Sequence, residues 1–149
     1  MKKSLFILSL LCVSILLPSF APQEKSNLTI VVSGLRSSDG AVLLSLYNRA
    51  DGFPRNPHAA IRKEKLPIVN GTATVSFKGL PYGSYAAALL HDENNNLDMD
   101  FNSLGMPREG YGFSNDAKAR FGPPKFDKAA FKINAPNAKI VINTKYLLN

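Results

Sequence analysis

The chain contains a single cysteine, Cys12, no tryptophan and only two histidines, His58 and His91. One thiol excludes an intrachain disulfide, and two histidines are too few for a zinc site built from His and Cys ligands. The 18 Lys and Arg side chains outnumber the 11 Asp and Glu, but they are scattered and do not cluster with aromatic residues. This scatter excludes an obvious nucleic-acid surface, so no nucleic-acid partner is expected. The sequence also has no long helical periodicity and no internal repeat.

The first 21 residues predict an export signal. Two lysines form a basic start, an apolar run covers 5–17, and residues 19–21 offer a small-x-small cleavage site. The apolar run is shorter than the roughly 20 residues that span a bilayer, so we expect no transmembrane span in the mature chain. The 149 residues less the 21 of the leader leave 128 residues, 22–149, enough for a single domain. We expect this domain in the periplasm or at the outer cell surface.

Alternation of apolar and polar residues predicts about seven short strands. They cover residues 28–35, 40–47, 61–69, 72–77, 84–90, 129–134 and 139–146. Asp39-Gly40 and Asn70-Gly71 are typical hairpin turns. The strand 84–90 is apolar on both faces and is expected at the centre of a sheet, whereas Pro67 places 61–69 at an edge. The expected fold is an all-β antiparallel sandwich, immunoglobulin-like or transthyretin-like, with one long loop region between about 91 and 126.

Oxygen-bearing side chains recur at every second residue directly after the central strand. They are Asp92, Asn94, Asn96, Asp98 and Asp100. Carboxylate and amide oxygens at this spacing are typical of calcium-binding loops. An EF-hand-like loop would have glycine in place of Leu97 and glutamate in place of Ser103, so Glu109 is the nearest candidate for a further carboxylate ligand. The sequence predicts a calcium site at these six oxygen-bearing residues. The alternatives are a site for another cation, or a turn in which Asn and Asp side chains cap their own backbone.

A second constellation in this region is aromatic and basic. Tyr111, Phe113 and Phe121 lie in a run rich in glycine and proline, close to Arg108. One hypothesis is that these four residues form a ligand-binding rim for an anionic glycan or for a peptide of an envelope protein. The alternative is that the rings, together with Phe126, plug the open end of the sandwich as a small core of their own.

A third constellation raises the question of catalysis. His91 ends the central strand and would serve as a general base beside Asp92 or Glu109, with Ser114 as a nucleophile. No nucleophile-elbow sequence surrounds the serine. The alternative is that the imidazole hydrogen-bonds to the long loop and fixes its path. We therefore expect a non-catalytic binding or structural accessory module of the cell envelope, with a small periplasmic hydrolase as the alternative.

Four motifs occur in order along the chain. They are Gly-Leu-Pro-Tyr-Gly-Ser-Tyr at 79–85, His-Asp-Glu-Asn at 91–94, Gly-Met-Pro-Arg-Glu-Gly-Tyr-Gly-Phe-Ser-Asn at 105–115 and Phe-Gly-Pro-Pro-Lys-Phe at 121–126. This ordered set resembles the bacterial family called domain of unknown function 2141, over essentially the whole mature chain. The resemblance implies an exported small β-domain and supplies no established activity. Members of that family often carry glycine where this chain has Leu97.

Overall fold

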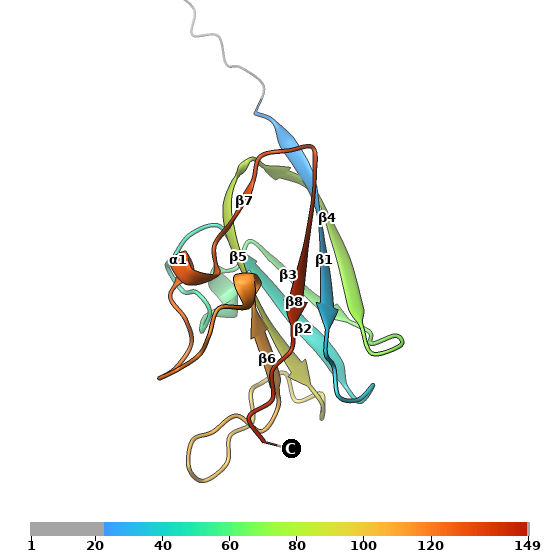
Figure 1. Cartoon of the computed structure of the whole chain (residues 1–149), viewed down its shortest axis with the longest axis vertical. Helices are drawn as coiled ribbons and strands as arrows, with labels where there is room; N and C mark the ends of the chain where they lie inside the picture. Colours follow the sequence, from blue (N-terminus) through green and yellow to red (C-terminus); the bar gives the residue numbers. More distant parts are fainter. Residues whose placement is uncertain (1–22, 149) are drawn as a thin grey trace, which may run out of the picture.

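The computed structural model describes residues 23–148, and the leader predicted at 1–21 lies outside the described residues. Two β-sheets face each other, as Figure 1 shows. The first sheet has the order β4-β1-β8, from strands Ala73–Pro81, Lys25–Ser33 and Asn137–Asn143. The second has the order β3-β2-β5-β6, from Arg62–Leu66, Ala41–Tyr47, Gly83–Asp92 and Gly110–Phe113, and β7 (Phe131–Ile133) also pairs with β5. The expected all-β sandwich is confirmed.

The strands differ from the expectation in their number, their pairing and their bounds. Neither Asp39-Gly40 nor Asn70-Gly71 closes a hairpin between neighbouring strands, because β1 and β4 lie in the first sheet and β2 and β3 in the second. The strand β6 was not expected, because glycines at 110 and 112 conceal the alternation of side chains. In addition, β8 runs parallel to β1, whereas every other paired strand is antiparallel.

The last strand also ends at Asn143 rather than 146, since the chain then crosses to the second sheet, where Lys145 forms a β-bridge with Tyr111. The predicted edge and central strands, β3 and β5, are found in those places.

The main core lies between the two sheets. Its centre is formed by alternate residues of β1 and β2, which are at most 1% exposed: Leu28, Ile30, Val32, Val42, Leu44 and Leu46. Burying one such aliphatic side chain stabilises the fold by about 1.5–3 kcal/mol. The alternation that predicted these strands from the sequence is therefore the alternation that builds the core.

A second apolar cluster covers the outer face of β5. Ala86 and Ala88 point to this face and are covered by Phe53, Phe113 and Phe126. The ring of Phe53 meets that of Phe126 edge to face, with centroids 5.8 Å apart. Because both faces of β5 are packed, this strand is a rigid support for the loops that follow it.

Short helical turns hold the covering segments in place. They are η1 (Pro57–Ala59), η2 (Ser114–Asp116) and α1 (Phe126–Ala129), and α1 lies on the side of β5 away from β1 and β8 (Figure 1). Within residues 23–148, no helix is long and apolar enough to cross a membrane.

Candidate functional site

The acidic loop leaves the end of β5 and folds around the side chain of Asp92. This side chain is fully buried, and its two carboxylate oxygens accept hydrogen bonds from the backbone N–H groups of Asn96 and Leu97, at 3.1 and 3.0 Å. The backbone of Leu97 has a φ of +70°, the left-handed conformation that glycine adopts without strain. The loop therefore makes the turn that glycine favours, with a leucine in its place.

Three of the predicted ligand side chains converge within this loop. The carboxylate of Asp100 accepts hydrogen bonds from the side-chain amide of Asn94 at 2.6 Å and from that of Asn96 at 3.2 Å. Asp98 does not join them, since its side chain is exposed and bonds only the next backbone N–H, that of Met99, at 2.8 Å. The structure thus places Asn94, Asn96 and Asp100 together, with Asp92 at the inner end of the loop.

Glu109 closes the base of the loop from the other side. It is 4% exposed, and its two oxygens accept hydrogen bonds from the backbone N–H groups of Glu93 at 2.9 Å and Asp100 at 3.2 Å. The sequence offered Glu109 as a candidate carboxylate ligand, and the structure places its side chain against the backbone of the loop. Among residues 23–148, no group of three or more His, Cys, Asp and Glu side chains is arranged as a metal site.

Arg36 ties the loop to the rest of the domain, and sequence reasoning missed it. Its guanidinium donates two hydrogen bonds to the Glu93 carboxylate, at 2.9 and 2.6 Å, and stacks over the Tyr146 ring at 4.5 Å. It also bonds the backbone carbonyls of Leu148 and Arg108, at 2.8 and 3.2 Å. The two hydrogen bonds from Arg36 to the Glu93 carboxylate hold the pKa of that carboxyl below its usual range. No sequence signal identifies such a link, because the partners are 57 to 112 positions from Arg36.

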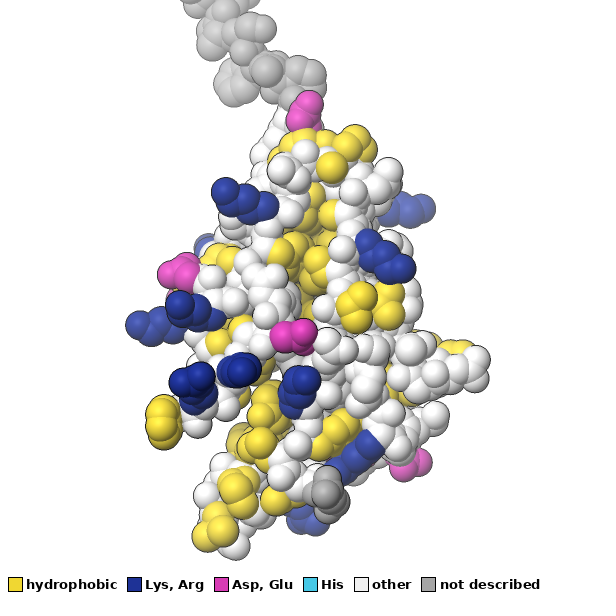
Figure 2. Space-filling model, in the orientation of Figure 1, with side chains coloured by type: hydrophobic (Ala, Val, Ile, Leu, Met, Phe, Trp, Pro, Cys, Tyr) yellow, Lys and Arg dark blue, Asp and Glu magenta, His cyan; other side chains and the backbone are white. Residues whose placement is uncertain are grey.

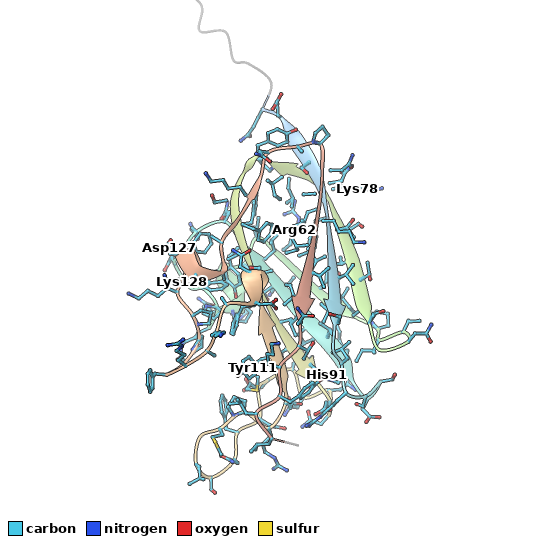
Figure 3. All side chains as sticks on the ribbon, viewed as in Figure 1. Arg62, Lys78, His91, Tyr111, Asp127 and Lys128 are labelled. Carbon is cyan, nitrogen blue, oxygen red and sulfur yellow. The ribbon has the colours of Figure 1, made fainter. Side chains whose placement is uncertain are left out.

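His91 is fully buried, and both of its ring nitrogens are occupied. Its Nε2 lies 2.9 Å from the Asp39 carbonyl, which can only accept, so this nitrogen carries the proton. Its Nδ1 lies 2.6 Å from the Tyr146 hydroxyl, within hydrogen-bond distance. The imidazole thus joins the turn before β2 to the C-terminal segment, rather than fixing the long loop as the sequence suggested. In this arrangement neither nitrogen is free to take a proton from a substrate. His91 lies at the same end of the domain as Tyr111 (Figure 3).

Ser114 is also fully buried, and its hydroxyl links β5 to α1. Its Oγ accepts a hydrogen bond from the Ala87 N–H at 2.9 Å and donates one to the Ala129 carbonyl at 2.5 Å. It therefore connects β5 to the end of α1, and the geometry gives no support to its role as a nucleophile beside His91.

The predicted aromatic rim is divided between different surroundings. Phe113 is 8% exposed and belongs to the outer cluster, Tyr111 is half-buried, and Phe121 is completely exposed. The rings of Phe113 and Phe126 thus form a small core, but they cover the outer face of β5 and not the open end of the sandwich. The exposed Arg108 lies at the base of the acidic loop, where its backbone N–H bonds the Asp100 carbonyl at 2.9 Å.

A groove of about 340 Å³ lies between the segment 116–120 and the C-terminal segment 143–147. Its walls carry the aromatic rings of Tyr111, Phe113 and Tyr146, together with the cationic residues Lys118, Arg120 and Lys145. Two of the four predicted rim residues, Tyr111 and Phe113, thus line a groove, while Arg108 and Phe121 do not. The contribution of the C-terminal segment was not foreseen, because the sequence alone assigned it to a regular strand.

Fold and site define the protein as a small β-sandwich whose loops build one end of the domain. A family model described as an uncharacterized protein conserved in bacteria (DUF2141) matches residues 30–141. The chain belongs to this family, as the ordered motifs predicted. No curated protein and no solved structure matches the chain.

Proposed function

We propose that this chain is an exported, non-catalytic binding module of the bacterial cell envelope, located in the periplasm or at the outer cell surface after loss of residues 1–21. The observation that carries the proposal is the groove beside β6, which combines aromatic rings with cationic side chains. Membership of a bacterial family and the leader predicted from the sequence support the location. The hydrogen bonds that occupy His91 and Ser114 support a binding role over the alternative of a hydrolase.

The ligand that suits the groove is an anionic glycan. Lys118, Arg120 and Lys145 supply positive charge, and the one acid of the lining, Asp116, is held by the Asn143 amide at 3.1 Å. Cationic walls attract the carboxylates of a uronic acid. The flat faces of Tyr111 and Tyr146 suit the apolar faces of sugar rings.

The test is a calorimetric titration of the mature protein with alginate oligosaccharides. Neutral dextran oligosaccharides serve as the uncharged comparison. We expect Lys145→Gln and Tyr111→Ala each to weaken alginate binding about fivefold or more, because each removes a contact of roughly 1 kcal/mol. Lys78→Gln is the matched control, since Lys78 is exposed on β4, away from the groove (Figure 3). Equal affinity for dextran, or equal weakening by Lys78→Gln, would contradict an anionic site in the groove.

We further propose that calcium braces the acidic loop. The support is the convergence of Asn94, Asn96 and Asp100 and the turn at Leu97, at which a calcium loop ordinarily has glycine. Asp92 and Glu109 would supply carboxylates from the two sides of the loop base. A cation would offset repulsion between these acids and would help to order a long loop.

Thermal unfolding in millimolar calcium and in chelator tests this proposal. A ligand that binds only the folded state adds about 2.7 kcal/mol at a hundredfold excess over its Kd. We expect a higher midpoint in calcium for the wild-type protein, and no calcium response for Asp100→Ala. Identical midpoints for the wild-type protein would show that the loop is a polar turn stabilised by its own backbone hydrogen bonds.

A further inference from the structure

Two loops at one end of the domain expose apolar side chains at their tips. The first is the hairpin 100–108, which is closed by hydrogen bonds from the Asn102 N–H to the Met106 carbonyl and from the Arg108 N–H to the Asp100 carbonyl, both 2.9 Å long. At its tip Leu104 is 79% exposed, and Phe101 is 57% exposed. Both apolar side chains are thus exposed on a hairpin whose backbone is closed by its own hydrogen bonds.

The second is the loop 117–125, which carries Phe121 in full contact with solvent. Gly122 and two prolines follow the ring, and the loop contains no acidic residue. It contains three exposed cationic residues, Lys118, Arg120 and Lys125. A fourth, Arg55, lies against the loop, because its guanidinium is 3.4 Å from the position that a Cβ of residue 122 would take.

Both loops extend from the lower left of the domain in Figure 1, away from the start of β1. In Figure 2 Lys and Arg side chains gather on the left of the domain, beside an apolar side chain that protrudes there, and further apolar side chains protrude below them. The protein therefore presents projecting apolar side chains in and next to a zone of positive charge.

We propose that these two loops dock the domain on an anionic lipid bilayer. An anionic membrane has negative charge at the level of the headgroups and apolar chains just below it, and apolar side chains beside Lys and Arg match this order. A glycan or a soluble acidic partner matches the charge but offers no apolar layer to receive the exposed side chains of Phe121 and Leu104. The proposal goes beyond the glycan groove, because Phe121, Leu104 and Phe101 do not line that groove.

The test is co-sedimentation of the mature protein with vesicles of phosphatidylcholine, alone or mixed with phosphatidylglycerol. Chelator is present throughout, so that a bridging metal ion does not contribute. We expect binding to the mixed vesicles and about tenfold weaker binding for Phe121→Ser, which removes a ring that would be buried in the bilayer. Each of Arg120→Gln and Lys125→Gln is expected to weaken binding about fivefold, since one basic residue near an anionic surface contributes about that factor.

Val69→Ser is the matched control, because Val69 is 61% exposed on the β3–β4 connection and lies outside both loops. It should bind the mixed vesicles as the wild-type protein does. Leu104→Ser is the second variant of the tips and should also weaken binding. All five substituted positions are exposed, and melting curves equal to the wild type will show that the fold is intact.

Three results would overturn the proposal: no binding to mixed vesicles, equal binding to the neutral vesicles, or binding that Phe121→Ser and Leu104→Ser leave unchanged. Loss of alginate binding in Tyr111→Ala with unchanged vesicle binding would support a lipid contact that does not depend on the groove, although Lys118 and Arg120 belong to both surfaces. Binding to alginate but not to mixed vesicles would refute the lipid surface while leaving the glycan groove in place.

Discussion

The clearest quantitative prediction concerns Asp92→Asn, because the buried carboxylate holds the acidic loop through two backbone hydrogen bonds. Asparagine keeps one acceptor oxygen but turns an amide N–H₂ group toward the second backbone N–H. Loss of a hydrogen bond to a charged acceptor costs about 1.5–3 kcal/mol, and a buried donor without a partner adds about 1 kcal/mol. We expect a loss of about 3 kcal/mol in the free energy of unfolding. At about 2.1 cal/mol/K of unfolding entropy per residue, a domain of this size then melts about 10 °C lower.

The control is Asp98→Asn, the same chemical change six residues further along the same loop. Asp98 is exposed and bonds only the adjacent Met99 N–H, and an asparagine oxygen can still accept that bond. Its effect should stay within about 0.5 kcal/mol, as is usual for exposed positions. Both variants are melted in chelator, so that metal binding does not enter the comparison. Equal midpoints for the two variants would refute the reasoning, since burial of the carboxylate would then have no effect on stability.

Three further predictions follow from the same end of the domain. Arg36 lowers the pKa of Glu93, so their ion pair stabilises the fold above the ordinary glutamate pKa of 4.5, and this stabilisation is lost as the pH falls through the lowered value. The variant Glu93→Gln lacks this ion pair, and its Tm should therefore decline less between neutral and acid pH than the Tm of the wild-type protein. Leu97→Gly should raise Tm slightly and Leu97→Val should lower it, because a left-handed backbone costs a leucine about 1–2 kcal/mol and strains a β-branched residue more. Gly110→Ala should lower the free energy of unfolding by about 2 kcal/mol in urea titrations, since its Cβ would lie 2.5 Å from the Tyr146 ring; an unchanged midpoint would mean that the ring moves freely.

The local features of this fold were readable from the sequence. Alternating apolar residues identified β1, β2 and β5, and the left-handed Gly40 and Gly71 show that the chain turns where Asp-Gly and Asn-Gly occur. The prediction that these turns close hairpins between neighbouring strands is wrong, because each of them joins strands of different sheets. The order of the motifs was enough to identify the family. These signals are local, because side-chain alternation and turn chemistry depend on neighbours a few residues apart.

The candidate site was only partly predictable. Six oxygen-bearing residues were assigned to one cluster from their spacing, and the structure brings the side chains of Asn94, Asn96 and Asp100 into contact, while Asp98 points to solvent. Spacing specifies which residues are near in the chain, but the path of the loop decides which side chains meet. That path depends on Glu109, which holds both ends of the loop, and on Arg36, which comes from another part of the chain.

The sequence by itself determined the strand segments, the turns, the family and the region in which the site lies. Only the tertiary structure decided the parallel pairing of β1 with β8, the cover of Phe53 and Phe126 over β5, and the hydrogen bond between His91 and Tyr146. It also decided that Phe113 is buried while Phe121 is exposed, although both occur in the same glycine-rich region. The physical reason is that alternation records which residues are buried, whereas their partners are set by the packing of segments as many as 112 residues apart.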